Sequence, residues 1–382
     1  MVGTLSGEPR HILLAGGGHA HAVALHQLAN NPPQPETRLT LVSPSTHNLY
    51  SGALPGVIAG HWQADDIGVP LQPLCEAIGA QFIQDRIAAI NPESRTAILG
   101  SGESISFDVM SLDIGSGIRP LDVTGSDGAI IPVRPIAPFL QKWESALEQI
   151  KARSTPSTII VTGAGLAGIE VALAIHYRLL QEGITTPAIH LIDPGDEIAA
   201  SSAAALRRKL YRALGRYGIN LMLQTSIRAI ENGCVTVSTG AKIATAFIVN
   251  CAGSAPHDWV AHTGLKTANG RIEVDACLRS ISHSHIWAAG DTSYFQPKSL
   301  PPAGVFAVRA GPVIAENIRR FSQDKDLAEY HPQTDYLKLV SLGQKRAVAE
   351  KFGLTLEGGW VWHLKKSIDF SFLRDHSPPS SH

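Results

Sequence analysis

Two stretches of the chain share one order of apolar and small residues: a short apolar run, a glycine cluster, then a longer run of small and apolar residues. The first begins at His11 with HILLAGGGHAHAVALHQL, and the second begins at Thr158 with TIIVTGAGLAGIEVALAIHYRLL. Each is typical of a buried strand, a tight turn and a helix. The repetition predicts two nucleotide-binding βαβ units in an α/β fold.

The same pattern predicts the elements that follow each helix. A second apolar strand ends at Ser43 after the first helix, and another ends at Asp193 after the second. Residues 97–117 alternate and then run apolar, as β structure does. A proline-rich stretch then indicates a crossing between domains, ahead of a helix of about 138–150. Its prolines are Pro120, Pro132, Pro135 and Pro138.

The C-terminal part of the chain changes character twice. Residues 304–321 predict a helix with Pro312 near one of its turns. From about Tyr330 the runs LKLVSLG, AVAEKFG and WVWHL are typical of short strands separated by turns. The tail DHSPPSSH is polar and proline-containing, which predicts disorder.

The second glycine turn is a full GxGxxG from Gly163 to Gly168. The first glycine allows a tight turn, Gly165 lets a pyrophosphate approach the backbone, and Gly168 lets helix and strand pack closely. The start of the helix, with Leu166 and Ala167, then presents free N–H groups and a positive dipole to the phosphates. The alternative is a purely structural glycine turn, but the flanking strand and helix favour dinucleotide binding.

Asp193, at the end of the next strand, fits the acid that binds the adenosine ribose hydroxyls. A carboxylate there repels a 2′-phosphate, and Asp196 and Glu197 follow closely. This favours NADH over NADPH. The alternative is an ordinary exposed turn aspartate before Pro194.

The first glycine turn is less regular. It keeps Gly16 and Gly18, but His21 stands at the third glycine position and Ser43 replaces the ribose-binding acid. The close-packing role then falls to small neighbours such as Ala20 and Ala22. A ribose contact, if made at Ser43, uses a hydroxyl. His19 and His21 form an H-x-H pair, but residues two apart on a helix face different sides, which disfavours a metal site.

Composition sets outer limits. The chain has 382 residues, 44% of them apolar and 17% charged, which suggests two or three domains with ample core. Its net charge of -1 disfavours nucleic acid and anionic lipid as partners of the whole surface. Residues 1–10 do not resemble a signal peptide, and no uninterrupted apolar run reaches membrane-spanning length. The default expectation is a cytoplasmic protein.

Five motifs in a fixed order make the chain resemble the two-dinucleotide-binding-domain flavoproteins, whose fold is of the glutathione reductase type. They are the two glycine turns, LDIGSG at Leu112, NCAGSAP at Asn250 and IWAAGDTS at Ile286. In that family the first unit binds FAD, the second binds NAD(P)H, and the aspartate of the late GD motif, here Asp291, hydrogen-bonds the FAD ribitol. The resemblance predicts an FAD domain from 1–118 and 253–328, an NAD(P)H domain at 119–252, and a C-terminal segment at 329–382.

The resemblance and the glycine turns together give two sets of expected cofactor contacts. The FAD set is Gly16, Gly18, His19, Ala20, Ser43, Tyr50, Gly115, Gly290, Asp291, Gly304 and Val305. The NAD set is Gly163, Gly165, Leu166, Ala167, Gly168, Asp193 and Gly253.

Within the family the chain is similar to the type II NADH dehydrogenase branch. It is closer still to a flavoprotein found alone or fused ahead of selenophosphate synthetase. The motifs behind this are GGGHAH, LYSGALPGVIAG, AGVFAVRAGP and WVWHLKKSIDFSFL. The branch implies FAD, a reduced nicotinamide donor and a second electron acceptor. Glu170 matches the GxxGxE of type II dehydrogenases, where the glutamate lies between the nicotinamide and flavin rings; the alternative is a solvated helix carboxylate.

The cysteines separate the subclasses of this family. Cys75, Cys234, Cys251 and Cys277 are widely spaced with no CxxC, which argues against a disulfide framework. Disulfide reductases need a redox pair after the first unit, and sulfide:quinone reductases need cysteines placed at the flavin. Neither spacing matches here. Direct hydride transfer from nicotinamide to flavin, followed by electron transfer, remains.

The acceptor is the open question. Type II dehydrogenases carry a glutamine pair at the quinone tunnel, and the matching positions here are Val305 and Arg309. This departure counts against quinone, and Arg309 suits an anionic or carbonyl-rich acceptor or an ion pair instead. The helix start at Gly304 is expected to face the pyrimidine edge of the flavin. The loop at Tyr50 is expected to cover the flavin, or to be a plain packed loop.

The C-terminal segment bears on the same question. Its aromatic and aliphatic residues fall at i, i+4 spacing: Trp360, Leu364, Ile368 and Phe372. If helical, this stripe predicts peripheral membrane contact; the alternatives are a strand, core packing or a homodimer contact.

The sequence therefore predicts an FAD-dependent NADH dehydrogenase that passes electrons to a quinone-type acceptor without a redox disulfide. One alternative is a reductase with a soluble small-molecule or protein acceptor. Another is a non-catalytic flavin sensor or partner protein, which the intact Gly163 turn and Glu170 disfavour.

Overall fold

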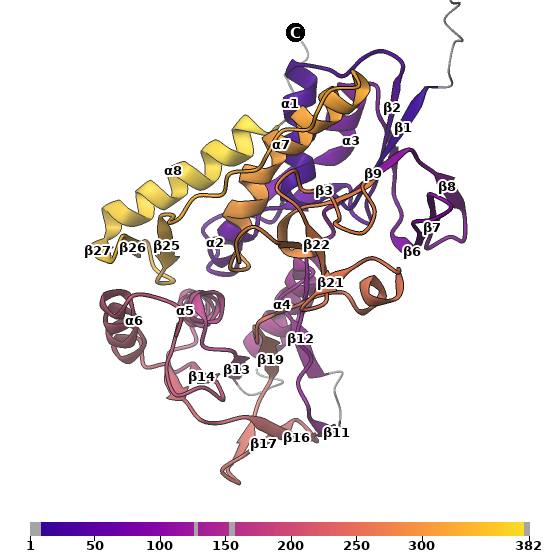
Figure 1. The fold of residues 1–382 in the computed structure, drawn as a ribbon. Helices are drawn as coiled ribbons and strands as arrows, with labels where there is room; N and C mark the ends of the chain where they lie inside the picture. The colour runs from indigo at the N-terminus through magenta and orange to yellow at the C-terminus, as the bar shows by residue number, and fades with distance from the viewer. Residues whose placement is uncertain (1–8, 126–128, 153–156, 378–382) are drawn as a thin grey trace, which may run out of the picture.

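Two parallel sheets, each with its glycine turn, form the frame of the molecule (Figure 1). The computed structural model describes residues 9–125, 129–152 and 157–377. Because both faces of a parallel sheet are covered, its central strands contain continuous buried apolar runs, here residues 12–15 and 159–161. The predicted α/β fold with two Rossmann-like units is confirmed.

The first sheet has the order β23-β9-β1-β2-β5, and all of its neighbours are parallel. Its strands are β1 (Arg10–Ala15), β2 (Thr37–Val42), β5 (Gln81–Ile83), β9 (Val109–Leu112) and β23 (Ile286–Ala288). Its helices are α1 (His19–Asn30), α3 (Leu71–Glu76) and α7 (Gly304–Ser322). α1 and α7 pack together, so the late segment of the chain completes the first unit.

The second sheet repeats this plan with the order β12-β19-β13-β14-β15. Its strands are β12 (Ile130–Pro132), β13 (Thr158–Thr162), β14 (Ala188–Ile192), β15 (Asn220–Met222) and β19 (Phe247–Asn250). Its helices are α4 (Ile136–Lys151), α5 (Leu166–Gln181) and α6 (Ala204–Arg216). The connectors between the units meet where β10 (Gly117–Ile118) pairs antiparallel with β20 (Ser254–Ala255).

Shorter strands and helices surround both units. Around the first are β3 (His47–Leu49), β4 (Gly68–Pro70), β6 (Ile87–Asn91), β7 (Thr96–Leu99), β8 (Ser104–Ser106), α2 (Leu54–Ile58), η1 (Ser51–Ala53) and η2 (Asp65–Ile67). Around the second are β11 (Thr124–Gly125), β16 (Ile227–Glu231), β17 (Cys234–Val237) and β18 (Lys242–Ala244). Between β20 and α7 lie η4 (Asp258–His262), β21 (Thr267–Ala268), β22 (Arg271–Val274), η5 (Gly290–Thr292) and β24 (Ser293–Phe295).

The C-terminal segment is a three-stranded sheet followed by a long helix. The strands are β25 (Lys338–Ser341), β26 (Ala347–Lys351) and β27 (Leu354–Gly358), and the helix is α8 (Gly359–Asp375), yellow in Figure 1. LKLVSLG and AVAEKFG are strands as predicted, whereas the strand predicted at WVWHL is wrong, because that run opens α8. Of the predicted disordered tail, Asp375 ends α8 and residues 378–382 lie outside the described residues.

The buried face of α8 explains why the sequence pattern predicted a strand where this helix begins. It carries Val361, Lys365, Asp369 and Leu373 at successive i, i+4 positions, so two charged residues stand where a core-facing helix normally shows apolar ones. The apolar line with Trp360, Leu364 and Ile368 is instead exposed.

Candidate nucleotide and electron-transfer site

The second glycine turn has the geometry that its sequence predicts. Gly163 has a φ of +93°, and a Cβ there would lie 2.6 Å from the backbone oxygen of Cys251. A Cβ on Gly168 would collide with the carbonyl oxygen of Gly163, so this glycine is what allows α5 to approach β13. Gly165 instead faces open space. A side chain there would obstruct only a ligand.

The start of α5 is ready for an anion. Gly165 and Ala167 are exposed, Leu166 is half-buried, and the first amides of a helix have no intrahelical partner. Asp193 lies beside the turn, where one carboxylate oxygen accepts a hydrogen bond from the Ala164 amide at 2.6 Å and the other accepts from Gly195 at 2.7 Å. A carboxylate has further lone pairs for ribose hydroxyls.

The first glycine turn reaches a similar geometry by different contacts. Gly16 has a φ of +92°, and a Cβ there would lie 2.5 Å from the Asp113 carbonyl oxygen. At the third position, His21 contacts the Gly16 carbonyl at 2.6 Å through Nδ1 and the Ser111 hydroxyl at 2.8 Å through Nε2. His21, rather than Ala20 and Ala22, therefore ties α1 to the sheet. Burial lowers the pKa of His21 to about 4, so its ring is neutral.

Ser43 lies beneath this turn and its hydroxyl has a local partner. It is buried and donates a hydrogen bond to the Ser45 carbonyl at 2.9 Å. A Cβ on Gly17 would lie 2.8 Å from the Ser43 Oγ, so the turn and the strand end are in close contact.

Asp113 is a feature that the motif analysis missed. It lies just after β9, and its Oδ2 accepts hydrogen bonds from the amides of Ala20 at 2.7 Å and His21 at 3.1 Å. It thus caps α1 beside Gly18, and burial raises its pKa to about 7. The D in LDIGSG was the available signal.

His19, Tyr50 and Phe372 form an aromatic group from three distant parts of the chain. Ring centroids are 5.6 Å apart for His19 and Tyr50, and 4.7 Å apart for Tyr50 and Phe372. A Cβ on Gly304, the first residue of α7, would lie 3.8 Å from the His19 ring. The group therefore lies where α1, α7 and α8 meet, and Phe372 from the C-terminal stripe faces inward.

A charged cluster adjoins these aromatic rings. Lys365 Nζ donates to Asp369 Oδ2 at 2.8 Å and to the Gly52 carbonyl at 2.6 Å. The Tyr50 hydroxyl donates to Asp369, and burial raises the pKa of both groups. Lys365 and Asp369 were not predicted as site residues; their i, i+4 spacing on one helix was the signal.

Glu170 joins this cluster from the second unit. Its carboxylate accepts a hydrogen bond from the Ser341 amide at 2.6 Å, and it lies within the field of Lys365 and Asp369. Burial raises the pKa of Glu170 to about 7. The residue predicted to lie between the two cofactor rings is thus within electrostatic range of Tyr50.

Asp291 is held by the interdomain connector. Its Oδ2 accepts from the Ser116 hydroxyl at 2.8 Å and from Arg134 at 3.2 Å. Arg134, unremarked in the sequence, also approaches His19, whose pKa burial lowers to about 4. Two nearby glycines, Gly115 and Gly290, have φ values of +67° and +62°, so both turn tightly here. Gly253, on the second connector, has a φ of +67° as well.

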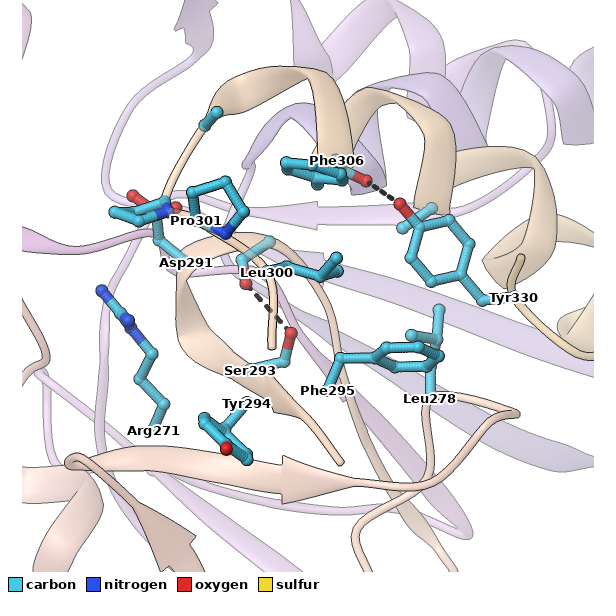
Figure 2. A pocket seen from close by; sticks show the side chains of 14 residues that line it. Arg271, Leu278, Asp291, Ser293, Tyr294, Phe295, Leu300, Pro301, Phe306 and Tyr330 are labelled. Carbon is cyan, nitrogen blue, oxygen red and sulfur yellow. Dashed lines mark hydrogen bonds between the residues drawn. The ribbon is translucent and has the colours of Figure 1, made fainter. Parts of the chain in front are cut away.

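Figure 2 shows a narrow pocket beside Asp291, with a cavity volume of about 40 Å³. Arg271 and Tyr294 form one wall, and Phe306 and Tyr330 close the other, where Tyr330 donates to the Phe306 carbonyl at 3.0 Å. A wider cavity of about 630 Å³ includes Tyr177 and Arg178. These residues lie about 16 Å along α5 from the glycine turn, so the cavity is remote from it.

The two predicted acceptor residues differ in exposure. Val305 is half-buried in the first turn of α7, and Arg309 one turn later is exposed and within electrostatic range of Tyr330. The carboxylate that accepts the hydrogen bond of Tyr50 belongs to Asp369 of α8.

The four cysteines are unpaired. Burial raises the pKa of Cys75 and of Cys251 to about 12, so both are neutral thiols.

Comparisons with known proteins agree with this geometry. The NADH dehydrogenase-like protein Rv1812c of Mycobacterium tuberculosis is 29% identical over 241 residues, which is 59% of this chain and 58% of that protein. The sulfide-quinone reductase of Aquifex aeolicus is 23% identical over 95% of this chain and 90% of its own. The chain thus spans less than two thirds of the first relative's length.

Solved structures show the same fold. The sulfide:quinone oxidoreductase of Aquifex aeolicus has a TM-score of 0.79 at 19% identity and covers 97% of this chain and 93% of its own. NDH2 from Plasmodium falciparum, solved in complex with NADH, has a TM-score of 0.79 at 14% identity, with 98% and 100% covered.

Two glycine turns, two crossing connectors and a shared junction define a flavin- and nicotinamide-dependent oxidoreductase fold. Residues 10–310 match the family described as pyridine nucleotide-disulphide oxidoreductase, and the chain belongs to that family. Membership of this family assigns FAD and NADH to the chain as cofactors, and NDH2 was solved with NADH. The residues present fit such ligands: Gly165 leaves a cradle that a Cβ would fill, and His19 Nε2 is buried without a partner among the described residues.

Proposed function

We propose that the chain is an FAD-dependent NADH dehydrogenase that passes electrons to a quinone-type acceptor without a redox disulfide. One observation carries the proposal. The Tyr50 ring contacts His19, which begins the helix after the first glycine turn, and Tyr50 is also within electrostatic range of Glu170, one turn into the helix after the second. The two nucleotide sites therefore converge on one junction, and α8 closes it.

In this proposal each turn binds one dinucleotide. The first unit holds FAD with Gly16, Gly18, His19 and Ala20 at the phosphates and Asp291 at the ribitol. The second holds NADH with Gly165, Leu166 and Ala167 at the phosphates and Asp193 at the ribose. When bound, FAD accepts a hydride from the nicotinamide and passes two electrons to the acceptor. Asp193 favours NADH, because its carboxylate repels a 2′-phosphate.

The residues at the junction fit a proton-requiring acceptor. The reaction NADH + H⁺ + quinone → NAD⁺ + quinol consumes one proton from the protein or solvent. Tyr50, Lys365, Asp369 and Glu170 are linked by hydrogen bonds or by electrostatic proximity. Tyr50, Lys365 and Glu170 can hold exchangeable protons, and the carboxylate of Asp369 accepts from Tyr50 and Lys365. We assign the acceptor to the aromatic rings of Tyr50 and Phe372, with this cluster as the proton source. Val305, the other predicted acceptor residue, lies in the first turn of α7.

A soluble acceptor is the second candidate. The exposed guanidinium of Arg309 favours it, because such a cation suits an anionic molecule or protein more than a quinone. The two candidates share the NADH and FAD sites and differ only in how the reduced protein is reoxidised.

The proposal includes peripheral membrane contact through α8 and β27. Exposed apolar residues lie on both elements and in the turn before β27: Phe352, Leu354, Leu356, Trp360, Leu364 and Ile368. Lys351 contacts the Phe352 ring and Lys366 the Trp362 ring, so cations adjoin the apolar surface. Among the described residues, no helix is both long and apolar enough to cross a membrane. A homodimer through the same surface is the alternative.

The experiment is anaerobic reduction followed by reoxidation. The purified protein is expected to be yellow, to bleach with NADH faster than with NADPH, and to regain its colour with short-chain quinones. A protein that binds no flavin after reconstitution would overturn the proposal. Bleaching that only a soluble dye or dioxygen reverses would transfer support to the soluble acceptor.

A further inference from the structure

The two nucleotide units can be compared position by position, because the same backbone contacts recur in both. The Asp113 amide donates to the Ala15 carbonyl at 2.8 Å, and the Cys251 amide donates to the Thr162 carbonyl at 2.8 Å. Each residue's carbonyl oxygen also faces the first glycine of its turn. Asp113 and Cys251 are therefore equivalent positions, each directly after the strand that pairs with the central strand of its sheet, β9 or β19.

The side chains at these positions differ in what they do to the helix start. The Asp113 carboxylate accepts from the second and third amides of α1, those of Ala20 and His21. The equivalent amides of α5, those of Ala167 and Gly168, have no acceptor in the described part of the chain. In the first unit a carboxylate therefore occupies the amides at the helix start, whereas in the second unit the equivalent amides are free to bind a phosphate.

The groups that face Asp113 do not neutralise it. From α1 come the backbone amides of Ala20 and His21, and the rings of His19 and His21 on that helix are neutral. From η5 comes Asp291, which raises the pKa of Asp113 further. Arg134, on the connector, pairs with Asp291. A Cβ on Gly290 would lie 3.0 Å from Asp113 Oδ1, so that side is closely packed. No Lys or Arg pairs with Asp113 among the described residues.

We propose that dinucleotide binding at the first glycine turn takes up one proton at Asp113. The inference rests on the proposed function, since FAD is the expected ligand. A pyrophosphate carries negative charge, and a second anion at the same helix start opposes it. The step is carboxylate + H⁺ + FAD → carboxylic acid with bound FAD. The protonated oxygen becomes a hydrogen-bond donor, which the ionised carboxylate is not.

Burial makes this uptake accessible near neutral pH. The pKa of Asp113 is already raised to about 7 before any phosphate is added, so protonation in that range requires little free energy. FAD affinity is then expected to fall as pH rises above about 7, because binding takes up one proton and the proton concentration of the solution decreases. The second turn, with Cys251, has no such carboxylate.

The test is the FAD dissociation constant measured by equilibrium dialysis, with free flavin detected by fluorescence, between about pH 6 and about pH 9. One-proton coupling predicts a dissociation constant that rises about tenfold per pH unit above about pH 7. D113N, whose amide oxygen still accepts from the helix, is expected to bind FAD with no such slope. D113C copies the second unit and is a further variant if D113N does not fold.

The NADH dissociation constant serves as the internal control, because the second turn is unchanged in both variants. A wild-type constant that is independent of pH, or an identical slope in D113N and D113C, would overturn the coupling while leaving FAD binding intact. A protein that binds no FAD at any pH would overturn the proposed function and the coupling with it.

Discussion

Lys365 and Asp369, one turn apart on α8, form an ion pair of 2.8 Å in which the side chains are only 10% and 4% exposed. Lys365 also donates to the Gly52 carbonyl, just after Tyr50. The pair therefore fastens the C-terminal helix to the junction of the two nucleotide units. A surface helix gains nothing from burying two charges, so their position points to a role at the junction.

Replacing the cation of this pair should slow acceptor reduction. K365M removes the partner of Asp369 and a proton carrier, so flavin reoxidation by quinone is expected to slow at least about tenfold, while bleaching by NADH is unchanged. Stopped-flow absorbance of the flavin separates the two steps. K366M, at an exposed neighbouring position, is the matched control. Equal slowing of both steps in K365M would argue against an acceptor-side role.

Removing Lys365 from the buried ion pair should also lower the stability of the protein. Breaking a buried pair from one side costs about 3–5 kcal/mol, because an uncompensated charge remains. K365M is expected to lower the free energy of unfolding by an amount in this range at a pH where Asp369 is ionised. Urea unfolding of the wild type, K365M and K366M checks this, and a loss below about 1 kcal/mol in K365M would show that the pair is not structurally coupled.

Alanine substitutions at two glycines of the second turn should have different effects, one on NADH binding and the other on stability. G165A meets no atom within 4 Å and keeps a φ of −70° that alanine accepts, so stability is expected to be unchanged and NADH binding weakened. G168A meets the Gly163 backbone, so it is expected to destabilise the unit itself. Thermal unfolding and NADH titration distinguish the two. Tight NADH binding by G165A would place the pyrophosphate elsewhere.

Acceptor reduction should depend on pH through Glu170. Its pKa is raised from the model-compound value of 4.5 to about 7, so the carboxyl carries a donatable proton below pH 7 and loses it above. The reoxidation rate is expected to fall as pH rises through about 7, and E170Q is expected to lose this inflection. The same raised pKa means that stability contributed by the neutral form is lost as pH rises from about 4.5 through about 7. An unchanged inflection in E170Q would assign it to another group.

The exposed apolar residues of α8 should govern lipid binding. A W360S/L364S/I368S variant changes only residues that are at least 39% exposed, so the fold should persist while flotation with anionic vesicles is lost. Analytical ultracentrifugation of the same variant tests the alternative. Unchanged flotation combined with loss of a dimer would identify a self-association surface instead.

The features of the fold that the sequence predicted are those that depend on local interactions. The turns at Gly16 and Gly163 and the strands around them are coded within short segments, and the structure has them where the pattern placed them. The junction is different, because Tyr50, Glu170 and Phe372 come from three distant segments. Lys365 and Asp369 lie on the buried face of α8, so the sequence there lacks the apolar periodicity of a packed helix. The apolar pattern alone could not show that the two charges pair with each other.

Asp113 shows the same limit within a motif that was recognised. Its strand was predicted, but its effect depends on a hydrogen bond from the Ala20 amide at the start of α1, a residue distant in sequence, which only the folded chain reveals. Similarly, His21 breaks the glycine pattern in sequence, yet its ring bonds to Gly16 and Ser111 restore the link between helix and sheet.

The most direct test of the proposed function is the rate at which the NADH-reduced flavin is reoxidised by a short-chain quinone in the absence of oxygen. The account predicts saturable reoxidation by the quinone that is at least about tenfold faster than by dioxygen, since a built acceptor site adds binding and orientation. Reoxidation that is no faster with quinone than with dioxygen would contradict it.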